Sequence, residues 1–165
     1  MKLPTSIIMA GGKGTRLSPF KPVLEVCKKP MIRWVIETAW DFSDQVFIAT
    51  TRNHPIEPML RTMDAKILYT SGYGYEVDVL EAVSRVERPT IVFPSDVPLI
   101  PKDAINLLIS ECRSSICSLL SRSEFIGVSI WKGLTLDNYQ SVTYPGLIIN
   151  VNTKEDYEKI NKNCP

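Results

Sequence analysis

The 165-residue chain lacks the features that mark membrane-spanning, zinc-binding and nucleic-acid-binding proteins. No apolar stretch approaches the roughly 20 residues of a membrane span, and no cleavable apolar region follows the N-terminus, so we expect neither a span nor a signal peptide. The single histidine, His54, and the four cysteines do not have the spacing of a zinc site. A net charge of only +1 argues against nucleic acid as a partner.

Linkers are also missing, and this bounds the organisation of the chain. The sequence contains no repeat, no low-complexity tract and no linker rich in proline, glycine and serine. We therefore predict one domain over residues 1–165, a length sufficient for one hydrophobic core. Cys112 and Cys117 lie in apolar surroundings and are expected to be reduced core residues, which agrees with a predicted cytoplasmic location.

Positive charge is concentrated near the N-terminus, although the whole chain is almost neutral. Residues 1–35 contain seven lysines and arginines and one acidic residue, Glu25, so this segment carries +6 within a chain of net charge +1. The basic residues are Lys2, Lys13, Arg16, Lys21, Lys28, Lys29 and Arg33. A basic pole on a near-neutral domain favours a compact polyanion as ligand.

Short apolar runs that alternate with helical patterns predict an α/β fold. We expect buried strands at residues 6–10, 46–50, 66–70, 90–94, 115–120, 125–131 and 147–151. Helical spacing of apolar residues occurs in three sets: Ile32, Val35, Ile36 and Ala39; Val77, Leu80 and Val83; and Ile105, Leu108, Ile109 and Cys112. Thr153, with Asp156 three residues later, predicts the start of a last helix. The alternation favours parallel pairing in a three-layer domain, and residues 121–146 are expected to form a loop or hairpin over the edge of the sheet.

Three glycines and three cations follow the first apolar run, in the stretch IIMAGGKGTRLSPFKPVL, residues 7–24. Glycines at the carboxyl end of a strand let backbone N–H groups face an anion without a side chain in the way. The stretch does not fit the Walker A pattern, because Gly14 rather than serine or threonine follows Gly12-Lys13. It does not fit the dinucleotide-binding pattern either, because Leu17 stands at the third glycine position. The segment is therefore predicted to serve another phosphate chemistry.

Several segments of the chain share motifs with one enzyme family. Met9–Leu17, followed by Lys21-Pro22-Val23, resembles the opening motif of the nucleotidyltransferases of the sugar-nucleotide and molybdenum-cofactor guanylyltransferase type. Ser95–Pro98 resembles the family's segment with a metal-binding aspartate, and Asn150–Thr153 resembles its late asparagine segment. Thr70–Tyr75 with Asp78 resembles one branch in particular, the archaeal adenosylcobinamide-phosphate guanylyltransferases. The likeness covers about residues 5–50, 66–100 and 147–160.

This resemblance implies a three-layer, Rossmann-like nucleotidyltransferase fold with a mostly parallel mixed sheet. It implies transfer of GMP from GTP to a phosphorylated acceptor with release of pyrophosphate, Mg²⁺ as cofactor, and the corrinoid adenosylcobinamide phosphate as the first choice of acceptor. The implied metal ligands are Asp96 and Asn152, and the implied catalytic residues are Arg16, Lys21 and Asp96. The implied nucleotide-binding residues are Ala10, Gly11, Gly12, Lys13, Gly14, Thr15, Arg16, Lys21, Thr70, Ser71, Gly72 and Asp78.

The chemistry requires these residue types independently of the resemblance. An acceptor phosphate attacks the α-phosphorus of a nucleoside triphosphate, so two anions must meet and cations must offset their repulsion. Arg16 can bridge phosphate oxygens with its planar guanidinium, and Lys21 acts as a point charge. Mg²⁺ prefers oxygen ligands and keeps several waters, so one carboxylate and one amide oxygen are sufficient protein ligands. Near Gly72, Asp78 or Glu76 could accept hydrogen bonds from guanine N1 and N2.

Several alternatives stay open on the sequence alone. Within enzymes they are a molybdopterin guanylyltransferase and a sugar-phosphate nucleotidyltransferase, and the short region 101–146 argues against the sugar enzyme. A nucleotide-binding regulatory subunit is the non-enzymatic alternative, and the combination of Arg16, Lys21 and Asp96 argues against it. Trp131 and Tyr139 could line an acceptor pocket, pack in the core or be exposed. His54 is expected in a surface loop, and a homodimer through the edge near residues 121–146 is also open.

Overall fold

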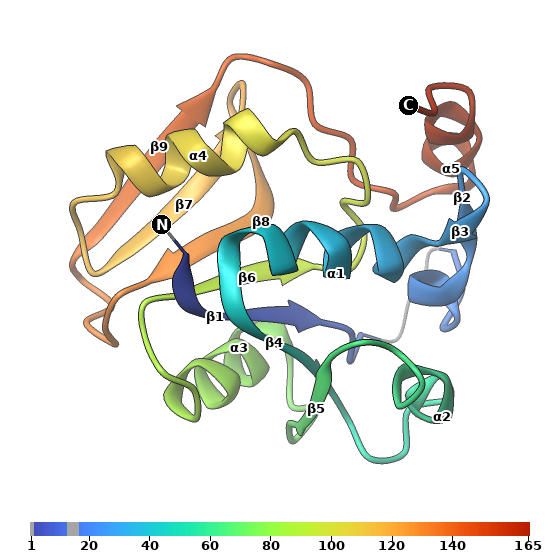
Figure 1. Ribbon diagram of the computed structural model, residues 1–165, viewed down its shortest axis with the longest axis horizontal. Coiled ribbons are helices and arrows are strands. Elements are labelled where there is room, and N and C mark those ends of the chain that lie inside the picture. The colour runs from blue at the N-terminus through green and yellow to red at the C-terminus, as the bar shows by residue number, and fades with distance from the viewer. Residues whose placement is uncertain (1, 13–16) are drawn as a thin grey trace.

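The computed structural model describes residues 2–12 and 17–165, and its main element is a seven-stranded sheet (Figure 1). The strand order is β5-β4-β1-β6-β8-β7-β9. The strands are β1 (Leu3–Met9), β4 (Ser43–Thr50), β5 (Lys66–Tyr69), β6 (Thr90–Pro94), β7 (Ile116–Ser121), β8 (Glu124–Trp131) and β9 (Tyr139–Tyr144). Strand β8 runs antiparallel to β6 and β7, and the other four neighbouring pairs are parallel. This confirms the predicted mostly parallel mixed sheet.

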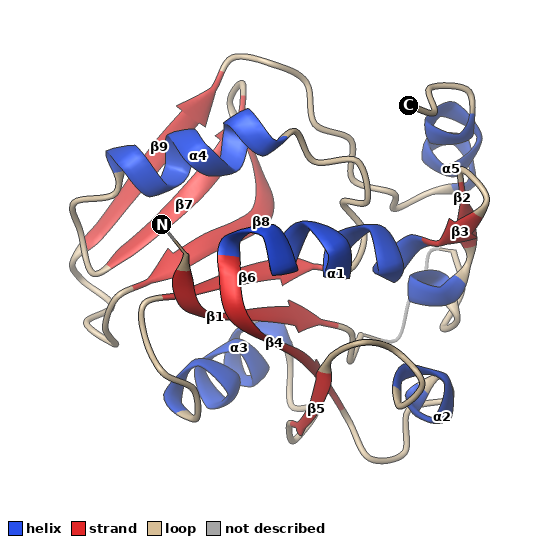
Figure 2. Cartoon of the chain, viewed as in Figure 1, coloured by secondary structure: helices blue, strands red, loops and turns tan. Residues whose placement is uncertain are grey.

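Helices cover both faces of this sheet and make three layers (Figure 2). Helices α1 (Met31–Phe42), α2 (Glu57–Leu60) and α4 (Lys102–Glu111) contribute buried residues to the core on one face. Helix α3 (Tyr75–Ser84) packs on the opposite face. The short helix η1 (Lys21–Val23), the hairpin of β2 (Glu25–Val26) and β3 (Lys29–Pro30), and helix α5 (Lys154–Asn161) lie at one end.

The central strands are apolar on both faces because both faces are covered. On β1, Ile7 belongs to the core under α3 and the next residue, Ile8, belongs to the core under α1 and α4, and both are fully buried. Successive side chains of a strand point to opposite faces, so a strand covered on both sides is a continuous apolar run. The same alternation occurs on β6, where Val92 and Phe93 face opposite cores.

Two predictions near the edge of the sheet were wrong: one predicted strand is absent, and one strand was not predicted. Residues 147–151 form no strand, although Ile148 and Val151 are buried in the core. Residues 139–144 form β9, an edge strand that pairs in parallel with β7, and its exposed positions made it look like a loop. Most of the region 121–146 is therefore part of the sheet, as β8 and β9. An apolar segment can be buried without joining a ladder, and a half-exposed edge strand needs few apolar residues.

The prediction for α3 was wrong at one of three positions: Val83 is buried and Leu80 packs against the core, but Val77 does not. Val77 was expected on the apolar face but is exposed, whereas its neighbour Asp78 is buried together with Val79, Ala82 and Val83. Because Asp78 is polar, the spacing of apolar residues did not indicate that its position in α3 is buried.

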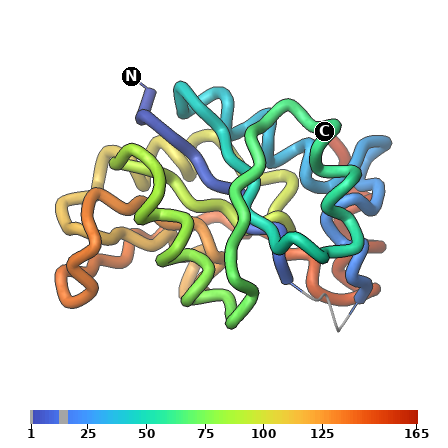
Figure 3. The backbone as a smooth tube through the Cα atoms, turned by 90° about the horizontal axis from the view of Figure 1, so that it is seen from below, coloured from blue at the N-terminus to red at the C-terminus, as the bar shows by residue number. Residues whose placement is uncertain are grey.

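The structure contains two disulfides, and one of them contradicts the expectation that Cys112 and Cys117 are reduced. Cys112 and Cys117 flank the turn from α4 into β7, where their Cα atoms lie 5.7 Å apart and their sulfurs are bonded. Cys27 is bonded to Cys164 and joins the β2–β3 hairpin to the C-terminal segment. Figure 3 shows the red C-terminal helix beside the blue hairpin region. The prediction of a cytoplasmic location has therefore lost the support that it took from the cysteines.

Among the described residues, no helix is both long and apolar enough to cross a membrane. The prediction of one domain over residues 1–165 stays a prediction.

Candidate active site

A cavity of about 500 Å³ lies at the carboxyl ends of β1 and β6. These two strands are parallel neighbours, with Met9 beside Pro94, so the segments that follow them emerge side by side. Ligands of open parallel sheets bind at such strand ends. Seven of the residues predicted to bind nucleotide or metal line this cavity: Ala10, Gly11, Gly12, Lys21, Gly72, Asp78 and Asp96.

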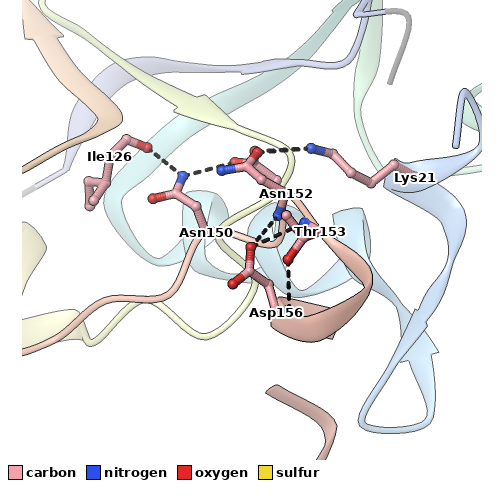
Figure 4. Close-up of polar contacts among 7 residues, drawn as sticks. Lys21, Ile126, Asn150, Asn152, Thr153 and Asp156 are labelled. Atoms are coloured by element: carbon pink, nitrogen blue, oxygen red, sulfur yellow. Dashed lines mark hydrogen bonds and ion pairs between the residues drawn. The ribbon is translucent and has the colours of Figure 1, made fainter. Parts of the chain in front are cut away.

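Lys21, Asp96 and Asn152 converge on one point at this cavity. The Lys21 ammonium lies 3.2 Å from Asp96 Oδ2 and 3.3 Å from Asn152 Oδ1. Lys21 comes from η1, Asp96 follows β6, and Asn152 precedes α5. Figure 4 shows Lys21 and Asn152 pointing toward each other. The predicted metal ligands and one predicted catalytic cation therefore form a single polar cluster.

Asn150 belongs to the same cluster, although the sequence did not single it out. Its side-chain amide donates to the carbonyl of Ile126 over 3.1 Å (Figure 4). The same amide donates to Asp96 Oδ1 over 3.2 Å. The backbone N–H of Val151 donates to the carbonyl of Asp96 over 2.8 Å. These contacts join the segment 150–152 to the end of β6 and orient the Asp96 carboxylate. The available signal was the position of Asn150 within the same motif as Asn152.

The start of α5 fixes the position of Asn152. Thr153 caps the helix: its hydroxyl accepts from the backbone N–H of Asp156, and the Asp156 carboxylate accepts from the backbone N–H of Thr153. The same carboxylate accepts from the backbone N–H of Asn152 over 3.1 Å (Figure 4). This confirms the predicted helix start and places the Asn152 side chain where its Oδ1 accepts from Lys21, although Asn152 itself is not part of the cavity lining.

The cluster fits a magnesium site with few protein ligands. One carboxylate oxygen and one amide oxygen already face a common cation, the Lys21 ammonium, and such oxygens are the ligands that Mg²⁺ prefers. In residues 2–12 and 17–165, no group of three or more histidine, cysteine, aspartate or glutamate side chains could hold a metal ion. Phosphate and water oxygens would therefore complete the coordination.

Two carboxylates of α3 hold the segment 70–74 at the side of the cavity. Asp78 Oδ1 accepts from the backbone N–H of Gly72 over 2.9 Å, and Glu81 Oε2 accepts from the backbone N–H of Ser71 over 3.1 Å. Gly72 has φ = +80°, and a Cβ there would lie 2.9 Å from the Thr51 methyl group, so any other residue would strain this turn and displace the Thr51 side chain. Asp78 is thus partly engaged in holding the segment, and its other oxygen remains for a ligand.

The other predicted nucleotide-binding residues lie outside this cavity or outside the described residues. Thr70 is buried, with its backbone N–H donating to Thr50, and with Ser71 it lines a neighbouring depression of about 720 Å³. Glu76 lines a different groove, beside β8. Lys13, Gly14, Thr15 and Arg16 are not among the described residues.

Gly12 and His54 form a contact that the sequence did not predict. His54 is buried rather than a surface residue, and its Nε2 lies 2.7 Å from the carbonyl of Gly12. Its Nδ1 accepts from the backbone N–H of Ile56 over 3.3 Å, so Nε2 carries the proton and donates to Gly12. Among the described residues, no atom lies within 4 Å of a Cβ built at Gly12. These residues therefore leave the backbone at Gly12 open to a ligand in the cavity.

Tyr75, the first residue of α3, also lines the cavity. Burial of the hydroxyl among protein atoms, with a smaller contribution from the Asp96 charge, raises the pKa of Tyr75 to about 12, although half of the residue's surface is accessible. The hydroxyl therefore remains protonated at neutral pH and can donate a hydrogen bond to a ligand.

This raised pKa predicts that Tyr75 gives no phenolate absorbance at pH 10 in the folded protein. Folded wild-type protein and the Tyr75→Phe variant should show the same phenolate absorbance at pH 10, because Tyr75 contributes none below its pKa of about 12. In guanidinium both proteins are unfolded, and the pKa of Tyr75 returns to its ordinary value near 10. Their absorbance at pH 10 should then differ by that of about half of one phenolate. A clear loss of signal in the folded variant at pH 10 would contradict the raised pKa.

A family model described as a MobA-like NTP transferase domain matches residues 6–158. The chain belongs to this family. The solved structure of molybdopterin-guanine dinucleotide biosynthesis protein A from Archaeoglobus fulgidus superposes on this MobA-like domain with a TM-score of 0.75 at 14% identity, covering 97% of this chain and 98% of that one. This similarity confirms the Rossmann-like nucleotidyltransferase fold.

Two curated relatives of the MobA-like domain differ in the nucleotide that their names indicate. Adenosylcobinamide-phosphate guanylyltransferase from Methanocaldococcus jannaschii is 30% identical over 112 residues, which cover 63% of this chain and 57% of that protein. The 3-deoxy-manno-octulosonate cytidylyltransferase from Aliivibrio salmonicida is 29% identical over 160 residues, which cover 93% of this chain and 59% of that protein. The chain thus spans less than two thirds of the length of both relatives.

The His54–Gly12 contact in the MobA-like domain predicts an effect on nucleotide binding. His54→Phe should weaken binding of the preferred nucleoside triphosphate roughly tenfold, because the Gly12 carbonyl loses its donor and the backbone around it can relax. His54→Gln, which keeps a side-chain N–H, should recover part of this loss. Calorimetric titration well below the melting temperature measures both variants, and wild-type affinity in His54→Phe would refute the positioning role.

Proposed function

We propose that this chain is a Mg²⁺-dependent guanylyltransferase that transfers GMP from GTP to a phosphorylated acceptor and releases pyrophosphate. Membership of the MobA-like NTP transferase family supports nucleotidyl transfer. The observation that carries the proposal is the convergence of Lys21, Asp96 and Asn152 at a cavity whose wall contains Gly11 and Gly12. We take adenosylcobinamide phosphate as the first acceptor to test, because the first of the two curated relatives carries that name.

The residues of the cavity suit this reaction without a protein nucleophile or strong base. An oxygen of the acceptor phosphate bonds to the α-phosphorus of GTP, the bond from that phosphorus to the bridging oxygen breaks, and pyrophosphate leaves. Asp96 and Asn152 would hold Mg²⁺, which would neutralise charge on the phosphate oxygens. The backbone at Gly11 and Gly12 lies open to the triphosphate, and Lys21 supplies a positive charge beside it.

Recognition of guanine is proposed at the segment 70–74. The free oxygen of Asp78 can accept one hydrogen bond from the guanine edge, while its other oxygen holds Gly72. Glu76 lines a separate groove and so does not take part in the proposed recognition of the base. Adenine presents no comparable pair of donors at N1 and N2, so an acceptor at this position favours guanine.

The decisive experiment measures pyrophosphate release with each of the four nucleoside triphosphates in the presence of Mg²⁺ and candidate acceptor phosphates. We expect GTP to support the highest turnover with adenosylcobinamide phosphate. CTP is the second nucleotide of interest, because the match to the cytidylyltransferase covers more of this chain. Turnover with CTP or UTP and none with GTP would refute the guanylyltransferase. Tight GTP binding with no turnover on any acceptor would favour a regulatory nucleotide-binding subunit.

A further inference from the structure

One face of the sheet is only partly covered, and this leaves a groove beside the active-site cavity. Helix α3, with ten residues, is about 15 Å long and 10 Å wide, whereas seven strands span roughly 29 Å. The helix shares a core cluster with residues of β1, β4 and β6, to which β7 and β8 add only Ile116 and Trp131 and to which β9 adds none of the described residues. Figure 3, viewed from the α3 side, shows the helix in front of the sheet with the orange 125–140 segment beside it.

The groove has a volume of about 440 Å³ and is lined mainly by apolar side chains. Leu80 of α3 forms one wall, and Phe125, Trp131 and Leu136 form the other. Phe125 and Leu136 are exposed over 64% and 59% of their surfaces, so the protein itself leaves a large apolar area facing solvent. Among the described residues, Glu76 is the only charged residue in the lining.

The groove adjoins the active-site cavity. Tyr75 lines both spaces. Pro94, which lines the cavity, lies beside Gly127, which lines the groove: a Cβ at Gly127 would come within 3.2 Å of the Pro94 side chain. A molecule that reaches from one space to the other would therefore pass Tyr75.

The direction of nucleotidyl transfer places the acceptor on this side. The attacking oxygen and the leaving pyrophosphate lie roughly in line on opposite sides of the α-phosphorus. The glycine segment that would hold the triphosphate follows β1, Asp96 follows β6, and β8 is the next strand beyond β6. A triphosphate that extends toward the β1 side therefore leaves the β8 side, with the groove, for the body of the acceptor.

We infer that the groove between α3 and β8 binds an apolar, uncharged body of the acceptor, whose phosphate reaches past Tyr75 to Asp96. This inference deepens the proposed function and rests on it for the position of the phosphate. The lining matches such a body because it contains Phe125, Trp131 and Leu136 and no cation among the described residues.

A sugar body does not match this lining. Sugar hydroxyls need hydrogen-bond partners when they are buried, and an unpaired buried hydroxyl weakens binding. Apart from Glu76 and from Tyr75, which also lines the active-site cavity, the groove offers only the hydroxyls of Ser118 and Ser129 among the described side chains, and that of Ser129 already accepts from the Trp131 indole over 2.9 Å. The acceptor class that fits is a phosphate monoester with an extended apolar surface, so a preference for such an ester would count against adenosylcobinamide phosphate, whose amide groups also need hydrogen-bond partners.

The test compares two phosphate monoesters that differ only in their body, 1-naphthyl phosphate and methyl phosphate. Each is titrated calorimetrically into the protein without added metal, with and without GTP. We expect 1-naphthyl phosphate to bind roughly tenfold more tightly than methyl phosphate, since the ring system removes apolar surface from water. Glucose 1-phosphate should bind no more tightly than methyl phosphate.

Variants locate the binding and separate it from packing. Phe125→Ala and Leu136→Ser should each remove most of the preference for 1-naphthyl phosphate and leave methyl phosphate and GTP binding unchanged. Leu147→Ser is the matched control, because Leu147 is exposed to a similar degree, 55%, and lines neither space. Equal affinity for the two esters, no binding of 1-naphthyl phosphate at millimolar concentration, or equal loss in Leu147→Ser would overturn the inference.

Self-association is measured on the same proteins by sedimentation. If Phe125→Ala converts a dimer into a monomer without altering the preference between the esters, the groove is an interface between two copies of this chain and the inference is wrong. Absence of GTP binding, with the preference for 1-naphthyl phosphate intact, would instead reject the proposed guanylyltransferase and leave an apolar binding groove. The two failures are therefore distinguishable.

Discussion

Asp96→Asn should reduce turnover at least about a hundredfold while the fold stays intact. The Asp96 carboxylate is the only full negative charge that the proposed metal site takes from the described residues, and its loss removes about 3 kcal/mol of transition-state stabilisation. Asparagine has the same shape, and the backbone contact between Asp96 and Val151 does not involve the side chain. One donor, Lys21 or Asn150, loses its acceptor, so a small decrease in melting temperature is expected.

The measurement is pyrophosphate release over a range of Mg²⁺ concentrations, together with thermal unfolding. Asp41→Asn is the control, because Asp41 forms an ion pair of 2.8 Å with Lys102 on the surface and lines none of the described cavities. That variant should keep wild-type turnover. Near-normal rates for Asp96→Asn at low Mg²⁺ would show that Asp96 does not hold the metal.

Lys21→Met should also lower turnover roughly a hundredfold, and it should weaken GTP binding as well. Methionine has a similar length without the charge, so the variant removes the cation that lies between Asp96 and Asn152. The side chains of Lys21 and Asp96 are exposed over only 17% and 15%, so the pair is better shielded from solvent than an ordinary surface ion pair. We therefore expect a loss of about 1–2 kcal/mol in stability, or a few degrees in melting temperature.

Lys29→Met provides the comparison for this variant. Lys29 forms an ion pair of 2.6 Å with Glu37 and lies over the Trp34 ring, away from the cavity. Its replacement should leave turnover unchanged even if the melting temperature decreases. Turnover of Lys21→Met within threefold of wild type would mean that the ammonium has no role in the reaction, and that Asp96 and Asn152 act without it.

Local patterns predicted the centre of the fold correctly and its edge poorly. The runs around β1 and β6 are continuous and apolar because both faces of these strands are buried, and this signal does not depend on the rest of the chain. At the edge, β9 is half exposed and residues 147–151 are buried without pairing, so the apolar character of a segment no longer indicates whether it joins the sheet. The prediction for α3 failed at Val77 because its neighbour Asp78 is buried instead. A buried carboxylate is tolerated there because it accepts a hydrogen bond from the backbone N–H of Gly72.

By itself the sequence determined the α/β class, the resemblance to nucleotidyltransferases, and Lys21, Asp96 and Asn152 as residues of one site. Those conclusions depend on periodicity and on motifs that each lie within a short segment. Only the tertiary structure decided that Lys21 bonds to residues 75 and 131 positions away, that buried His54 holds the carbonyl of Gly12, that the cysteines pair, and that α3 leaves a groove open. The physical reason is that these contacts exist only after strands distant in the sequence become neighbours in the sheet, and no local pattern records which side chains then meet.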